Sequence, residues 1–137
     1  MIEGTFDITA LERANKKLGE SLERYNKEKL DEALRDSVIK RFEFTYSMAL
    51  SSLRKYFVSK AFIVDDINEM TFNDMVRTAN QLNLLESNLE KWTDYRQARN
   101  MTAHAYDEKI ALRVVEIIPD FHREIEFLIR RLRGVNE

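Results

Sequence analysis

The sequence contains no cysteine, only one proline and only three glycines in 137 residues. The absence of cysteine excludes a disulfide framework and any metal site built on thiolates, and it is compatible with a reducing cytoplasm. So few prolines and glycines leave few turn signals, which disfavours a sandwich or barrel of short strands. No apolar run approaches the roughly 18 residues of a membrane-spanning helix, and the first residues lack a basic start followed by an apolar stretch. We therefore expect a soluble, cytoplasmic protein without a signal peptide.

Apolar residues and charges of both signs dominate the composition. Hydrophobic residues make up 44% of the chain and charged residues 34%. The chain has 22 basic and 24 acidic residues, which give a net charge of -2. This composition is typical of amphipathic helices, so we expect an all-α protein in which residues 1–137 form one domain. A protein that coats nucleic acid needs a broadly basic surface, which this balance excludes, whereas a local basic site is compatible with it.

Hydrophobic periodicity divides the chain into helices joined by short segments. Apolar residues recur at helical spacing over about 8–27, 32–58 and 72–82, and the pattern is interrupted over 59–70. The second helix carries the main core stripe, whose members are Val38, Phe42, Tyr46, Ala49, Leu50, Leu53 and Phe57. Aromatic residues at this spacing favour core packing over a platform for stacking bases. Long helices with short joints predict an antiparallel up-and-down bundle of four main helices and a short one.

Helix starts are predicted from residues that cap the first turn. The candidates are Asp7 or the pair Thr9 and Glu12, Thr71 with Asp74, the pair Ser87 and Glu90, and Asp107. The pair at Ser87 would open the helix that carries Arg99, and Asp107 would open the last helical segment. Pro119 lies inside that segment, and we expect it to kink or break the helix because proline has no backbone N–H.

The run from Arg99 to Tyr106 concentrates a fixed cation, a titratable imidazole and a phenol in eight residues. Arginine grips a phosphodiester with two hydrogen bonds, and the imidazole of His104 exchanges a proton near neutral pH. On an ideal helix Arg99 and Tyr106 share a face, and Asn100 and His104 share the neighbouring one. Arg96, three residues before Arg99, would project beside it. This arrangement predicts one edge of a cleft suited to phosphate chemistry.

The same residues resemble the signature of the HEPN family, an arginine followed by four to six residues and a histidine. The stricter form (Arg, any four, His, any one, Tyr) is matched by Arg99, His104 and Tyr106, and it is similar to that of the HepT-like proteins, also known as nucleotidyltransferase substrate-binding proteins. The aromatic segment 41–50 resembles the second helix of that family. The resemblance covers about 11–132, nearly the whole chain.

The chain departs from the family pattern at three places. The family often has an acidic residue near Ser47, a tryptophan near Leu50 and an acidic residue where this chain has Ala98. A supporting carboxylate is therefore not implied for this chain, although the three motif residues are intact.

The resemblance implies a HepT-like ribonuclease toxin that acts without a metal or other cofactor. Arg99 and His104 would be catalytic, with Arg96 and Asn100 in support, in a cleft shared by two copies of the chain. Because Trp92 and Tyr95 adjoin the face of Arg96 and Arg99, we expect a second copy to be needed to complete the cleft. The implied partners are a second copy, an RNA substrate and a minimal nucleotidyltransferase that acts as antitoxin. The resemblance further implies that this nucleotidyltransferase silences the toxin by transferring AMP from ATP to the phenol of Tyr106.

Two other interpretations fit the sequence. In one, the chain is a non-catalytic subunit that binds substrate for the nucleotidyltransferase. In the other, it is a structural helical dimer in which Arg99 and His104 are buried packing. Outside the motif, we expect His122 to be a surface or hydrogen-bonded helix histidine. The terminal cations Arg130, Arg131 and Arg133 favour a role in stabilising a helix C-terminus. The two histidines lack carboxylate partners at metal-ligand spacing, so no metal site is expected.

Overall fold

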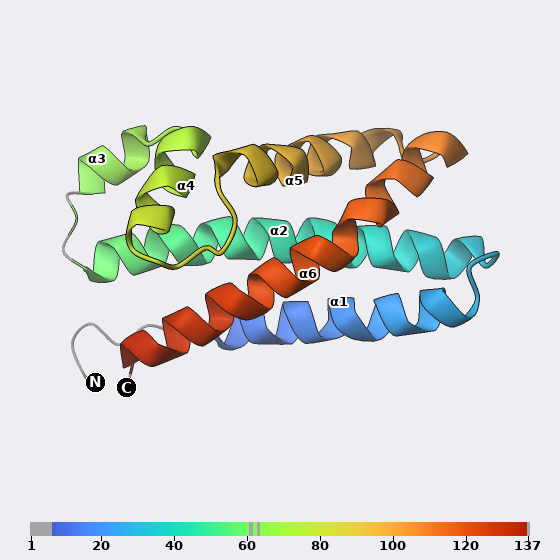
Figure 1. Ribbon diagram of the computed structural model, residues 1–137, viewed down its shortest axis with the longest axis horizontal. Helices are drawn as coiled ribbons and strands as arrows, with labels where there is room; N and C mark the ends of the chain where they lie inside the picture. Colours follow the sequence, from blue (N-terminus) through green and yellow to red (C-terminus); the bar gives the residue numbers. More distant parts are fainter. Residues whose placement is uncertain (1–6, 61, 63, 137) are drawn as a thin grey trace.

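The computed structural model describes residues 7–60, 62 and 64–136, and every regular element in these ranges is helical (Figure 1). The elements are α1 (Thr9–Lys27), α2 (Glu32–Ser59), α3 (Val64–Glu69), α4 (Phe72–Gln81), α5 (Leu89–Met101), a 3-10 turn η1 (Thr102–His104) and α6 (Glu108–Asn136). The predicted all-α bundle of four main helices and a short one, α4, is confirmed. No helix in the described ranges has the length and apolar character needed to cross a lipid bilayer.

Helices α1 and α2 are antiparallel neighbours, α5 runs along α2, and α6 crosses in front of α2 (Figure 1). Aromatic rings fill the space between these helices. Phe121 of α6 meets Phe42 edge to face at 5.0 Å between ring centroids, and it meets Tyr95 at 5.3 Å. Trp92 and Tyr95 are fully buried in this cluster. The core stripe predicted for α2 is therefore confirmed, and Trp92 and Tyr95 belong to the same core.

Two of the predicted helix starts are confirmed. Thr71 and Asp74 form a reciprocal capping box at α4, and the Asp107 carboxylate accepts the Lys109 N–H at 2.9 Å at the start of α6. At α1 the Thr9–Glu12 box does not form. Asp7, the competing cap, accepts the Thr9 N–H at 2.9 Å, and this bond lowers the pKa of the Asp7 carboxyl. A charged acceptor is favoured at a helix N-terminus, where the dipole is positive.

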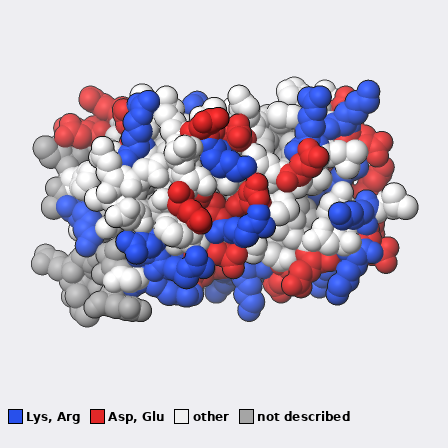
Figure 2. Space-filling view, viewed as in Figure 1, with Lys and Arg blue, Asp and Glu red and all other residues white. Residues whose placement is uncertain are grey.

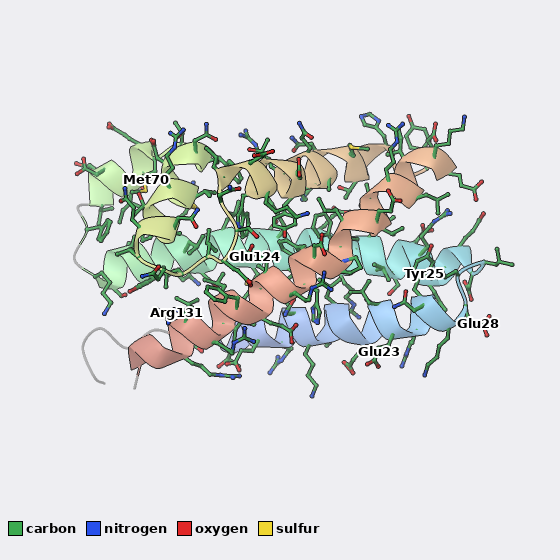
Figure 3. All side chains as sticks on the ribbon, in the orientation of Figure 1. Glu23, Tyr25, Glu28, Met70, Glu124 and Arg131 are labelled. Carbon is green, nitrogen blue, oxygen red and sulfur yellow. The ribbon has the colours of Figure 1, made fainter. Side chains whose placement is uncertain are left out.

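The capping box predicted at Ser87 and Glu90 is wrong because a distant residue takes its place. Glu124 of α6 is 3% exposed, and its carboxylate accepts the N–H groups of Glu86 at 2.8 Å and of Ser87 at 3.0 Å. Figure 3 shows Glu124 beside the segment that leads into α5. The cap of α5 is instead Asn88, whose side chain accepts the Lys91 N–H. Glu124 thus fixes the start of α5 against α6.

Two further expectations need correction. The interruption over 59–70 contains the short helix α3, with Ile67 buried and two acidic residues in its first turn. Pro119 does not break the last helix, because α6 continues through it as one element of 29 residues. The neighbours Ile118 and Phe121 are fully buried on either side of the proline. Packing of both halves against the same core outweighs the one backbone hydrogen bond that proline cannot make.

Helices α1 and α6 approach closely at Gly19. A Cβ at this position would lie 2.8 Å from the His122 ring. His122 Nδ1 lies 3.0 Å from Asn15 Oδ1, and the Asn15 amide donates to the His122 carbonyl at 3.3 Å. Burial lowers the pKa of His122, against the raising influence of Glu126. The expectation of a hydrogen-bonded helix histidine is confirmed.

Candidate functional site

The motif begins on the last turn of α5, whose direction is set by its buried face. Trp92, Tyr95 and Ala98 of that face pack into the core. Because successive helix residues are rotated by about 100°, Arg99 comes next to this buried face and near α2. The α-helix ends at Met101 and continues as the 3-10 turn η1. The core packing of α5 therefore determines where the Arg99 side chain lies.

Arg99 is held by a hydroxyl from its own chain segment and a carboxylate from α2. Its Nη1 donates to Thr102 Oγ1 at 3.1 Å, and the Thr102 hydroxyl donates in turn to the Arg99 carbonyl at 2.7 Å. The same Nη1 lies 3.9 Å from the Glu43 carboxylate. About a third of the Arg99 side chain is exposed. Arg99 therefore presents a positioned cation at the surface with donors left for an anionic ligand.

Sequence reasoning missed both partners of Arg99. Glu43 lies inside the aromatic segment 41–50, but nothing in its local spacing pairs it with a residue on another helix. Thr102 had a local signal, since threonine three residues after a helical residue often donates back to that residue's carbonyl. Glu43 of α2 thus places a carboxylate near Arg99 that the family pattern did not indicate.

The cations Arg96 and Arg99 lie on the same side of α5 but have different neighbours. The Arg96 guanidinium lies over the Phe72 ring of α4, 4.9 Å from its centroid. Burial raises the pKa of Tyr46 on α2 to about 12, and the charges of Arg96 and Arg99 oppose that rise. The charges of both arginines therefore influence Tyr46 of α2, and the Arg96 guanidinium also packs against α4.

His104 ends η1, and Tyr106 lies on the tight turn that leads from η1 to α6. Their rings meet edge to face with 6.2 Å between centroids. The His104 carbonyl accepts the Asp107 N–H at 3.0 Å, and Asp107 caps α6. Both side chains are exposed, Tyr106 by 88%. The start of α6 thus fixes the backbone that presents these two rings to solvent.

The expectation that one ideal helix carries the motif is wrong. The α-helix stops at Met101, so Arg99 and Tyr106 do not share a helical face, and proximity of His104 to Tyr106 arises from the turn instead. Asn100 is exposed, and its side chain makes no hydrogen bond to the part of the chain that the structure describes. A brace from Asn100 to the His104 imidazole is therefore absent from this structure.

A buried arginine lies beside the motif and was not recognised in the sequence. The Arg35 side chain, near the start of α2, is only 10% exposed, and its Nη1 lies 3.6 Å from the carboxylate of Glu108, the first residue of α6. Among the described residues, none accepts a hydrogen bond from Arg35 Nε. Glu108 directly follows Tyr106 and Asp107. Arg35 thus pairs with the helix start that holds the His104–Tyr106 turn.

The motif lies at the surface, and its residues do not line the open groove formed by α1 and α6. An open groove of about 970 Å³ runs along α1 and α6 and is lined by His122, Gly19 and their neighbours. Among the terminal cations, Arg133 pairs with Glu12 at this groove, whereas Arg131 donates to the Asn83 carbonyl after α4 at 2.8 Å. Within the described ranges, no three His, Asp or Glu side chains gather as a metal site would require.

A family described as "Nucleotidyltransferase substrate binding protein like" matches residues 6–134. The chain belongs to this family. The resemblance to HepT-like proteins predicted from Arg99, His104 and Tyr106 is thereby confirmed. All three residues lie within the matched range.

Two relatives from Haemophilus influenzae are similar to this member of the family. A protein named "Probable ribonuclease HepT" is 36% identical over 99 residues, which are 72% of this chain and 67% of the relative. A solved structure, described as revealing the fold of a substrate-binding domain of a nucleotidyltransferase, matches with a TM-score of 0.86 at 29% identity. That match covers 93% of this chain and 99% of the other. The two names correspond to the two functions considered next.

Proposed function

We propose that this protein is a metal-independent ribonuclease toxin of the HepT type, active in the cytoplasm as a dimer and silenced by AMP on Tyr106. The relative named as a probable ribonuclease supports the activity. The observation that carries the proposal is the arrangement of the motif. A positioned cation, Arg99, is linked through Thr102 to the turn on which His104 and Tyr106 meet at 6.2 Å.

The cleavage step needs only groups that the chain and the RNA supply. His104 accepts the proton of a ribose 2′-hydroxyl, whose oxygen attacks the adjacent phosphorus. The bond from phosphorus to the 5′-oxygen breaks, and that oxygen takes a proton from an imidazolium. The products are a 2′,3′-cyclic phosphate and a 5′-hydroxyl. Arg99 binds the phosphoryl oxygens and stabilises their added negative charge. Acid–base catalysis contributes about 10²- to 10⁴-fold to the rate of such a step, and fixed donors contribute a comparable gain.

A dimer suits this chemistry because the motif of one copy is an open surface. Two copies of His104 facing one cleft supply the base and the acid separately, and two copies of Arg99 enclose the phosphate between them. Light scattering tests this part of the proposal. We expect about twice the 16.3 kDa mass of one chain at micromolar concentration. A mass near 16.3 kDa that does not change on concentrating would overturn the shared cleft.

Modification of Tyr106 is supported by its exposure. The chain has five tyrosines, and the other four (Tyr25, Tyr46, Tyr56 and Tyr95) are buried. Tyr106 alone offers its phenol to the active site of a partner nucleotidyltransferase without unfolding. The phenolic oxygen attacks the α-phosphorus of ATP, pyrophosphate leaves and the phenolic proton is released. The added phosphate and base would cover His104 and repel the RNA backbone.

The second candidate is a non-catalytic subunit that binds substrate for a nucleotidyltransferase. The description of the solved relative favours it, as does the open, exposed form of the motif in one copy. In this case Arg99 and His104 bind an anionic substrate and do not cleave RNA. The two functions differ in one measurement, RNA cleavage by the purified chain.

The test is cleavage of single-stranded RNA by the purified protein and by His104→Ala and Arg99→Ala. We expect cleavage by the wild type in the presence of EDTA and loss of cleavage in both variants, with unchanged helical circular dichroism. Arg77→Ala is the matched control, because Arg77 is an exposed cation on α4 outside the motif. Full activity in a folded Arg99→Ala or His104→Ala, or loss of wild-type activity on chelation, would overturn the mechanism.

A further inference from the structure

Helix α2 carries exposed cations on its outer face. From Ser37 to its end, the helix has four cations (Lys40, Arg41, Arg54 and Lys55) and one carboxylate, Glu43. The chain as a whole has slightly more acids than bases. On the side of the molecule where α6 crosses in front, charges of both signs alternate (Figure 2). Over its whole length α2 has an excess of two cations over carboxylates, the same as α1, so what distinguishes α2 is where its cations lie.

Helical geometry places Lys40, Arg54 and Lys55 on the side of α2 that faces away from the bundle, whereas Arg41 lies beside α1. Phe42 and Tyr46 face the core and meet Phe121 of α6. At about 100° per residue, Lys40 and Phe44 lie roughly 160–200° from Phe42. Both are exposed, and Phe44 is 59% exposed although it is a large apolar side chain. An aromatic ring is thus presented to solvent beside a lysine.

We name this surface the basic face and define it by Lys40, Phe44, Ser47, Ser51, Arg54 and Lys55. Lys40 and Arg54 lie fourteen residues apart, or about 21 Å along the helix axis. The two serines between them are small and leave the helix backbone open to close approach. The basic face therefore has cations at both ends, the exposed ring of Phe44, and a central part formed by the small side chains of Ser47 and Ser51.

The basic face continues into the motif. Glu43 lies one helical turn from both Lys40 and Ser47, and its carboxylate is 3.9 Å from Arg99 Nη1. The one carboxylate within this stretch of α2 is therefore paired with the motif arginine. Along α2 itself, no other carboxylate lies between Ser37 and Ser59, and the Asp7 carboxylate before α1 interacts with Lys55 at the end of the basic face farther from Lys40.

We infer that the basic face binds the phosphate backbone of single-stranded RNA and leads it to Arg99 and His104, with Phe44 stacking on a base. This inference rests on the proposed ribonuclease function and names where its substrate lies. Cations that follow the nucleic-acid backbone, together with an exposed aromatic ring on which a base stacks, are common in proteins that bind single strands without sequence preference. A second copy of the chain fits this surface less well, because a two-fold axis on α2 would set Lys40, Arg54 and Lys55 against like charges.

The test measures binding of a fluorescein-labelled, 2′-O-methyl oligouridine of twelve nucleotides, which lacks the 2′-hydroxyl needed for cleavage. We expect Lys40→Glu/Arg54→Glu to weaken binding at least tenfold at low salt. The slope of log affinity against log salt should fall in magnitude by about 1.4, since each lost phosphate contact on a single strand is worth about 0.7. We expect Phe44→Ala to weaken binding about tenfold with little change in that slope.

The matched control is Lys16→Glu/Arg130→Glu, which reverses two exposed cations of the α1–α6 groove on the other side of α1. It should bind the oligonucleotide within about twofold of the wild type. Equal RNA binding by the basic-face variant and this control would overturn the inference. So would a basic-face variant whose oligomeric mass changes, or one that still binds RNA normally but no longer binds the purified nucleotidyltransferase partner. If the wild type cleaves RNA and the basic-face variants bind RNA normally, this inference fails and the proposed function stands. If the wild type neither cleaves nor binds RNA, the proposed function itself fails.

Discussion

The guanidinium of Arg99 lies 3.9 Å from the carboxylate of Glu43, so an ion pair links the motif arginine on α5 to the neighbouring helix α2. Both side chains are about one-third exposed. An ion pair in this environment contributes little to stability, on the order of 0–1 kcal/mol. Its larger effect is on charge, because Glu43 offsets part of the field that Arg99 presents to an anion.

We expect Glu43→Gln to leave the melting temperature nearly unchanged and to tighten binding of uncleavable RNA several-fold at low ionic strength. The gain should shrink at high salt, which screens charges at the surface. Titrations at two salt concentrations measure both effects. Glu116→Gln removes the same charge from an exposed site on α6 and serves as the control. Identical affinities for the two variants would show that Glu43 does not act on the Arg99 site.

Gly19→Ala is expected to destabilise the fold by about 1–3 kcal/mol, the usual cost of overpacking. The new Cβ would meet the His122 ring at 2.8 Å, and that ring is held in place by Asn15. Gly134→Ala is the matched control, because a Cβ there meets nothing within 4 Å and alanine favours helix. Urea unfolding of both variants measures the difference. Equal stabilities would mean that the α1–α6 crossing adjusts without strain.

The free energy of unfolding should fall as the pH drops below about 6.5, the ordinary pKa of histidine. Burial lowers the pKa of His122, so the folded state binds a proton less readily than the unfolded chain. The stabilisation from neutral His122 is therefore complete above the ordinary pKa and is lost as the pH falls toward the lowered one. Unfolding curves between pH 5 and pH 8 test this.

His122→Gln should flatten that pH dependence. Glu126→Gln should steepen it, because Glu126 favours the protonated imidazole and opposes the effect of burial. A pH dependence that survives in His122→Gln would assign it to another group.

Features with local causes were predictable from the sequence, and features with distant causes were not. The capping box of Thr71 and Asp74 and the cap at Asp107 depend on residues within one turn, and both are present. The box expected at Ser87 is absent because its backbone N–H is bonded to Glu124, 37 residues away. Pro119 was expected to kink or break a helix that its buried neighbours keep continuous.

The same distinction applies to the candidate site. Arg99, His104 and Tyr106 were recognised as a motif because their spacing is fixed in the chain. Their arrangement was not predictable from an ideal helix, since the α-helix ends at Met101 and a 3-10 turn brings the two rings together. Glu43 comes from another helix, so no local pattern could link it to Arg99.

The central claim is that Arg99, His104 and Tyr106 form one site at which RNA is cleaved and cleavage is silenced. The most direct measurement follows intact mass and RNA cleavage together while the protein is incubated with its neighbour-encoded nucleotidyltransferase and ATP. We expect AMP-sized mass increments on the wild type with a parallel loss of cleavage, and neither change in Tyr106→Phe. Increments at another residue, or a modified Tyr106 in a protein that still cleaves RNA at the full rate, would contradict the account.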